Sequence, residues 1–197
     1  MTRAATRTRK TKETDIEIVL DVDGPTGVVE TTTGLPFFDH MLDQLGRHGG
    51  FDLVVRAEGD LAVDAHHTVE DTGLAVGEAL AQALGTKAGV RRFASGLFPL
   101  DEALVEVALD LSGRPHLAWA VGAGEVGLGS PPFDPRLAEH FWASLVTKAG
   151  VTLHVTARTG DHPHHLVEAA FKGTARCLRD AVRVDGGGAV PSTKGVL

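Results

Sequence analysis

Two stretches of the sequence carry the same histidine pattern: "DAHHTVEDTG" at residues 64–73 and "DHPHHLVEAA" at residues 161–170. In each stretch two adjacent histidines are followed, three positions after the second, by a glutamate. The first histidines of the two patterns, His66 and His164, lie 98 residues apart. A repeat over this distance indicates that a whole structural unit is duplicated.

The segments around the two patterns also follow one order of expected elements. Alternating apolar residues predict strands, and apolar residues three or four positions apart predict helices. The expected order in each half is strand, strand, helix, strand and helix: 14–24, 27–33, 36–49, 51–59 and 66–85, then 101–113, 114–122, 135–150, 151–160 and 164–182. The sequence therefore predicts an α+β fold of two β-β-α-β-α half-domains, each a sheet with helices on one face.

The length of 197 residues and the 43% of apolar residues suit one domain or a tight pair of half-domains. We expect the first half-domain over residues 13–90 and the second over residues 91–184. Residues 1–12 are basic and are expected to be a disordered tail. Residues 185–197 are rich in glycine and are expected to form a non-helical C-terminal tail.

The composition excludes several classes of protein. A formal net charge of −7 argues against a nucleic-acid-binding protein. No apolar run approaches the roughly 20 residues of a membrane span, and no secretory signal is visible. Cys177 is the one cysteine, which excludes a disulfide framework and a cysteine-rich zinc site. We therefore expect a soluble protein of a reducing compartment, with Cys177 in its core.

The repeated pattern suits a pair of metal ions. On a helix His66 and Glu70 share one face, whereas His67 diverges from His66 by about 100°. Adjacent histidines can therefore serve two different metals. His40 and His140 precede the two patterns at nearly equal distances, 26 and 24 residues. The candidate ligands form two equivalent quartets: His40, His66, His67 and Glu70, then His140, His164, His165 and Glu168.

Imidazole and carboxylate ligands suit manganese, iron, zinc or nickel. Four protein ligands on an octahedral ion leave positions open for substrate, which is typical of a catalytic site. Candidate anion-binding residues are Arg92, Arg114, Lys172, Ser192 and Lys194. By spacing alone these are solvated polar residues, except that Lys172 lies one helical turn beyond Glu168 on the metal-bearing face.

Six longer stretches resemble the imidazoleglycerol-phosphate dehydratase family of histidine biosynthesis. They are "FFDHMLDQLGRHGGFDL", "DAHHTVEDTGLAVGEAL", "PLDEALVEVALDLSGRP", "EHFWASL", "HHLVEAAFKGTARCLRDAV" and "PSTKGVL". The resemblance runs in order from about Glu13 to Leu197, and the departures from it are confined to turns and to the glycine-rich loop 122–132. It implies the ribosomal protein S5 domain 2-like fold.

The resemblance also implies an activity. The expected reaction is the dehydration of D-erythro-imidazoleglycerol phosphate to imidazoleacetol phosphate by a cytoplasmic lyase, through an imidazolate bound to two manganese ions per site. It implies a 24-mer with active sites between subunits. The resemblance implies that Glu13 and Glu168 act as the acid and base, with Glu70 as the pseudo-equivalent of Glu168. It also implies that five residues hold the phosphate, the last two of them in the C-terminal tail: Arg92, Arg114, Lys172, Ser192 and Lys194.

Three other functions would fit parts of the pattern. A di-metal hydrolase would release inorganic phosphate, but such sites usually use bridging carboxylates and this set is rich in imidazole. A metal-storage or scaffold oligomer would bind metal without turnover. A nucleic-acid module would depend on the basic residues 1–12 and bind in a salt-dependent way.

Overall fold

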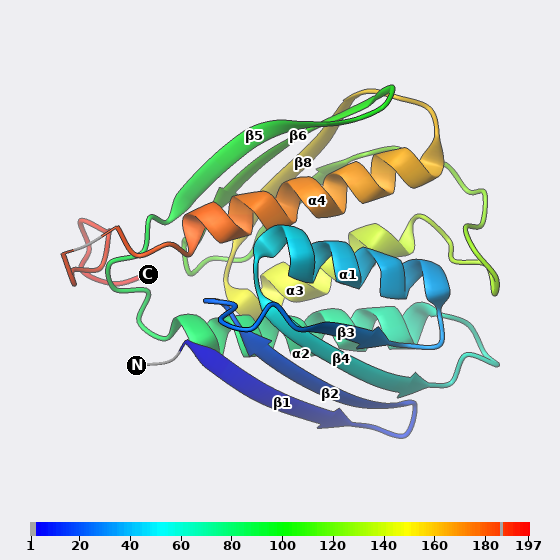
Figure 1. The fold of residues 1–197 in the computed structure, drawn as a ribbon, viewed down its shortest axis with the longest axis horizontal. Coiled ribbons are helices and arrows are strands. Elements are labelled where there is room, and N and C mark those ends of the chain that lie inside the picture. The colour runs from blue at the N-terminus through cyan, green and yellow to red at the C-terminus, as the bar shows by residue number, and fades with distance from the viewer. Residues whose placement is uncertain (1–2, 186) are drawn as a thin grey trace.

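The computed structural model describes residues 3–185 and 187–197, and it shows the predicted duplication (Figure 1). The first half contains β1 (Ala4–Lys10), β2 (Thr14–Asp21), β3 (Val29–Thr32), α1 (Pro36–Gly49), β4 (Asp52–Gly59) and α2 (His66–Leu84). The second half contains β5 (Phe93–Leu100), β6 (Ala103–Asp110), β7 (His116–Ala120), α3 (Leu137–Ala149), β8 (Thr152–Thr159) and α4 (Pro163–Ala181). The α+β class and the duplication are confirmed.

Each half builds one four-stranded sheet. The strand order is β1-β2-β4-β3 in the first sheet and β5-β6-β8-β7 in the second. β1, β2 and β4 are antiparallel neighbours, and β3 runs parallel to β4. The second sheet repeats these relations. The four helices lie between the two sheets, so each sheet carries helices on one face, as the sequence predicts (Figure 1).

Each half has one strand more than the sequence predicts. The predicted disorder over residues 1–12 is wrong for residues 4–10, which form β1 and pair with β2 along their whole length. The basic residues mislead because acidic residues of the fold pair with them: Arg9 pairs with the buried Asp71, and Lys10 pairs with Asp15 at the surface. β5 contains Gly96 and Pro99, which resemble a linker in sequence, but an edge strand tolerates proline because one side of its backbone needs no partner.

The two halves share one hydrophobic core between the sheets. α1 packs against α4, and α2 packs against α3, so each helical contact joins the two halves. Phe38 of α1 stacks on Phe133 at a centroid distance of 5.8 Å, and Phe141 of α3 stacks on Phe171 of α4 at 5.4 Å. Trp142 is fully buried beside them. Among the described residues, no helix is both long enough and apolar enough to cross a lipid bilayer.

Two glycines on α2 set how closely α3 can approach. A Cβ atom added to Gly73 would lie 2.6 Å from the backbone oxygen of Phe141, and one added to Gly77 would lie 2.5 Å from that of Leu145. Both contacts are with backbone, which cannot rotate out of the way. The absence of side chains at these two positions therefore lets α2 and α3 meet, and this contact brings His66 of α2 beside His140 of α3.

Replacing Gly77 with alanine is expected to lower the free energy of unfolding by about 1–3 kcal/mol, because the added methyl group overpacks the α2–α3 contact. Helix propensity alone predicts the opposite sign, a gain of about 1 kcal/mol for alanine over glycine. Chemical denaturation followed by circular dichroism measures the difference. A variant that is as stable as the wild type, or more stable, would contradict the close helix approach.

Candidate functional site

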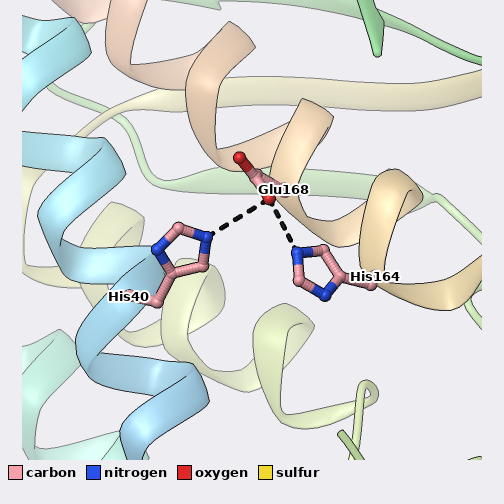
Figure 2. Close-up of side chains that lie close together, drawn as sticks. All are labelled: His40, His164 and Glu168. Atoms are coloured by element: carbon pink, nitrogen blue, oxygen red, sulfur yellow. Dashed lines mark hydrogen bonds and ion pairs between the residues drawn. The ribbon is translucent and has the colours of Figure 1, made fainter. Parts of the chain in front are cut away.

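The tightest cluster of metal-ligating side chains joins the two halves of the chain. His164 and Glu168 lie one turn apart on α4, and His40 reaches them from α1 (Figure 2). The Nε2 atom of His164 lies 2.8 Å from Oε2 of Glu168, and that of His40 lies 3.3 Å from the same oxygen. The packing of α1 against α4 creates this cluster, because His40 and Glu168 are 128 positions apart in the chain.

Glu168 is the buried anion at the centre of this cluster. Its second oxygen, Oε1, accepts a hydrogen bond from Nζ of Lys172 at 2.5 Å. Burial alone would raise the pKa of Glu168, but the hydrogen bonds from Lys172, His164 and His40 and the positive charge of Lys172 outweigh it and lower this pKa to about 2. Glu168 is therefore ionised throughout the physiological pH range.

The donor atoms of this cluster fit a divalent cation. One ligand atom from each of His40, His164 and Glu168 lies within 4.8 Å of the other two. Two imidazole nitrogens and one ionised carboxylate are a donor set that suits manganese, iron, zinc or nickel. Three donors leave at least one position for a further ligand and one for substrate in an octahedral ion.

A second, looser cluster stands in the pseudo-equivalent place. His66 and Glu70 of α2 are 3.4 Å apart between Nε2 and Oε2, and the ring of His66 lies 4.9 Å from that of His140 on α3. The side chain of Glu70 is 45% exposed, compared with 10% for Glu168. Position 74, one turn beyond Glu70, is leucine, whereas the corresponding position of α4 is Lys172.

The structure groups the predicted ligands across the two halves. The sequence counts one quartet of candidate ligands in each half and leaves open which of them share an ion. In the structure His40 of the first half meets the His164 pattern of the second, and His140 of the second half meets the His66 pattern of the first. The physical reason is that α1 packs against α4 and α3 against α2.

The second histidine of each pattern faces a different neighbour from the first, as the helical spacing predicts. Nδ1 of His67 lies 3.0 Å from Oδ2 of Asp60, with Glu13 at 3.9 Å. Nδ1 of His165 lies 2.8 Å from Glu102. These hydrogen bonds raise the pKa of both histidines. A histidine held by a carboxylate through Nδ1 is oriented to offer Nε2 to a metal.

Asp60 and Glu102 therefore orient two of the candidate ligands, and neither is among the candidate residues predicted from the sequence. Glu102 has one signal in the sequence: it occupies the turn between β5 and β6, as Glu13 occupies the turn between β1 and β2. That correspondence becomes visible only when β1 and β5 are recognised as strands. Asp60 has no comparable signal, because it lies in the irregular connection between β4 and α2.

Most of the candidate anion-binding residues line one cavity of about 520 Å³ near the C-terminus. It contains four of the five: Arg92, Arg114, Ser192 and Lys194. Arg92 is held in place because its Nε donates to Asp110 at 2.7 Å and its Nη1 to the carbonyl oxygen of Pro191 at 2.7 Å. Lys172 does not line this cavity and is bound to Glu168 instead.

The cavity and the histidine clusters lie at opposite ends of α4. His164 is near the first residue of α4, and the backbone N–H of Arg92 donates to the carbonyl oxygen of Ala181, the last residue of α4, at 3.0 Å. Ala181 lies 17 positions after His164, a separation of about 26 Å along the helix. α2 and α4 both begin at the right of Figure 1, and the C-terminal segment lies at the left. One small molecule therefore cannot bridge both regions of a single chain.

The chain is similar to known proteins in both sequence and structure. The family model "Imidazoleglycerol-phosphate dehydratase" matches residues 33–178. The protein of that name from Parafrankia sp. is 56% identical to this chain, and the alignment covers the whole of both proteins. The one from Acidothermus cellulolyticus is 54% identical, and the alignment covers 99% of this chain and 93% of the relative.

Two solved structures of imidazoleglycerol-phosphate dehydratases have the same fold. The enzyme from Staphylococcus aureus aligns with a TM-score of 0.80 at 30% identity, over 92% of this chain and 99% of the other. The enzyme from Pyrococcus furiosus, solved in complex with (S)-C348, aligns with a TM-score of 0.77 at 33% identity, over 97% of this chain and all of the other.

Proposed function

The chain belongs to the imidazoleglycerol-phosphate dehydratase family, the hydro-lyases of histidine biosynthesis. We propose that its active site combines two divalent cations held by one copy of the chain with a phosphate site supplied by another copy. The reaction is the loss of water from D-erythro-imidazoleglycerol phosphate to give imidazoleacetol phosphate. The observation that carries the proposal is the cluster of His40, His164 and Glu168, with His66, His140 and Glu70 more loosely arranged in the pseudo-equivalent place.

The cations would be held by three residues each: His40, His164 and Glu168 in one cluster and His66, His140 and Glu70 in the other. We propose manganese, which accepts imidazole and carboxylate ligands together. When bound, the two cations supply positive charge that makes the imidazole ring of the substrate acidic enough to react as its anion. The buried, ionised Glu168 is suited to balance that charge.

The proton transfers need a carboxylate that is free to approach the substrate. Glu13 has that freedom, because it stands at the tip of the β1–β2 hairpin with 54% of its side chain exposed. Glu168 is held by Lys172, His164 and His40, and its lowered pKa leaves it a poor proton acceptor. We therefore propose Glu13 as the acid–base residue, with Glu168 and Glu70 acting mainly as cation ligands.

Two observations support active sites shared between copies. His67 and His165 are oriented by carboxylates through Nδ1, yet each lies outside the cluster of its own chain, so each can complete the cation site of a neighbour. The phosphate cavity with Arg92, Arg114, Ser192 and Lys194 lies about a helix length from the clusters of its own chain. A closed assembly of 24 copies would satisfy both requirements.

Removal of metal tests the reaction and the cofactor together. Protein stripped with a chelator is expected to lose essentially all conversion of imidazoleglycerol phosphate to the ketone, and added Mn²⁺ is expected to restore it. Ketone formation, inorganic phosphate release and particle mass are measured on the same samples. Release of phosphate without ketone would identify a hydrolase, and full activity in protein shown to be free of metal would contradict the proposed cation sites.

A further inference from the structure

Asp71 is a buried carboxylate immediately after Glu70 on α2, and residues of the β1–β2 hairpin donate hydrogen bonds to both of its oxygens. Oδ1 accepts a hydrogen bond from Nε of Arg9 on β1 at 2.9 Å, and Nη2 of the same guanidinium forms an ion pair with Oδ1 at 2.8 Å. Oδ2 accepts one from the hydroxyl of Thr14, the first residue of β2, at 2.6 Å. Asp71 is 7% exposed. Both strands of the hairpin are thus attached to the helix that carries His66, His67 and Glu70.

The tip of the same hairpin is also fixed, and it carries Glu13. The Thr11 hydroxyl accepts hydrogen bonds from the backbone N–H of Glu13 at 3.1 Å and from that of Thr14 at 3.0 Å. The carbonyl oxygen of Glu13 accepts the N–H of Asp60 at 3.0 Å, and Asp60 is the residue that binds His67. Asp71 therefore contacts both strands immediately beside the turn, and the hydrogen bonds of the turn orient Glu13 toward His67.

In the second half of the chain, the corresponding hairpin packs on its helix without a buried charge at the equivalent positions. Three apolar residues stand at the positions equivalent to Arg9, Thr14 and Asp71: Phe98, Ala103 and Ala169. Ala103 and Ala169 are each 1% exposed, and the hairpin tip still brings Glu102 to His165. The fold therefore does not require a buried ion cluster at this place.

A buried ion pair contributes little net stability, because desolvation offsets the attraction, but its directional hydrogen bonds can select one geometry. We propose that Asp71 is a positioning residue, which holds the β1–β2 hairpin so that Glu13 reaches the substrate beside His67. The inference rests on the proposed function, since it assigns Asp71 to the reaction through the acid–base role of Glu13.

The test is a double-mutant cycle of Asp71→Asn with Glu13→Gln. Asp71→Asn is expected to lower kcat by about 10- to 100-fold, with KM changed much less and with unchanged metal content and particle mass. In the Glu13→Gln background the same substitution should cause no further loss, because Asp71 acts through Glu13. An equal loss in both backgrounds, or a fall in metal content, would overturn the positioning role.

A second pair of variants covers the case in which Asp71→Asn does not fold. Thr14→Val removes one hydrogen bond to Asp71 with little change of shape and should also lower kcat. Thr14→Ser keeps the hydroxyl group and should therefore keep kcat near the wild-type value. Equal activity of the two variants would again overturn the role of Asp71. Wild-type protein, metal-loaded and folded, that forms no ketone would overturn the proposed function itself, a result that these variants cannot mimic.

Discussion

Replacing His164 with alanine is expected to lower kcat/KM for dehydration by about 1000-fold or more, and to reduce the metal content from two ions to about one per chain. His164 supplies one of three donor atoms in the tighter cluster, and its Nε2 lies 2.8 Å from Glu168. Without it the cluster retains only His40 and Glu168. Elemental analysis of the purified protein and steady-state kinetics measure the two effects.

His154→Ala is the matched control for this prediction. His154 lies on β8 next to His116, with ring centroids 5.5 Å apart, and neither residue belongs to a cluster. We expect metal content and kcat/KM close to those of the wild type. His66→Ala, the pseudo-equivalent of His164→Ala, should remove a similar amount of metal. Normal metal content in both His66→Ala and His164→Ala would refute the assignment of the two clusters.

Mixed particles of two inactive variants are expected to recover activity. The first variant is His164→Ala, which keeps the phosphate cavity. The second combines Arg114→Ala with Lys194→Ala, two exposed residues of that cavity, and keeps both histidine clusters. If cluster and cavity come from different copies, random co-assembly leaves about one quarter of the sites with both parts intact, and activity should rise from near zero to about one quarter of the wild-type value.

The physical reason for this recovery is the length of α4, which separates His164 from the cavity lined by Arg92 by about 26 Å. Each variant refolded alone must stay inactive, and mass measurement must show that the mixed particles contain both chains. No recovery in such particles would mean that each chain builds its own complete site. That result would also require a large rearrangement of the C-terminal segment.

The sequence predicted most of the fold because its strongest signal is the repeat itself. The spacing of His66, His67 and Glu70 on a helix places the two histidines on different sides, and the structure shows them beside different partners. The sequence does not predict β1 or β5, and the reasons differ. β5 contains Gly96 and Pro99, which are typical of a linker. The charges of β1 are typical of a solvated tail, and they become compatible with burial only through acids such as Asp71, 62 positions away from Arg9.

The sequence names candidate site residues one by one, but it does not give their arrangement. Lys172 illustrates the difference: its spacing correctly places it one turn from Glu168, but its distance from the Arg92 cavity depends on the whole length of α4. The sequence does not identify Asp60 and Glu102, because their hydrogen bonds to His67 and His165 join a loop or turn to the first turn of a helix. No local sequence pattern predicts such a tertiary contact.

By itself the sequence determined the duplication, the α+β class, the helical histidine patterns and the types of side chain available for chemistry. These are consequences of local spacing, because helix and strand periodicity act over a few residues. Only the tertiary structure decided that His40 joins His164 and that His140 joins His66. The packing of α1 on α4 and of α2 on α3 depends on glycines, aromatic residues and a shared core that the two halves form together.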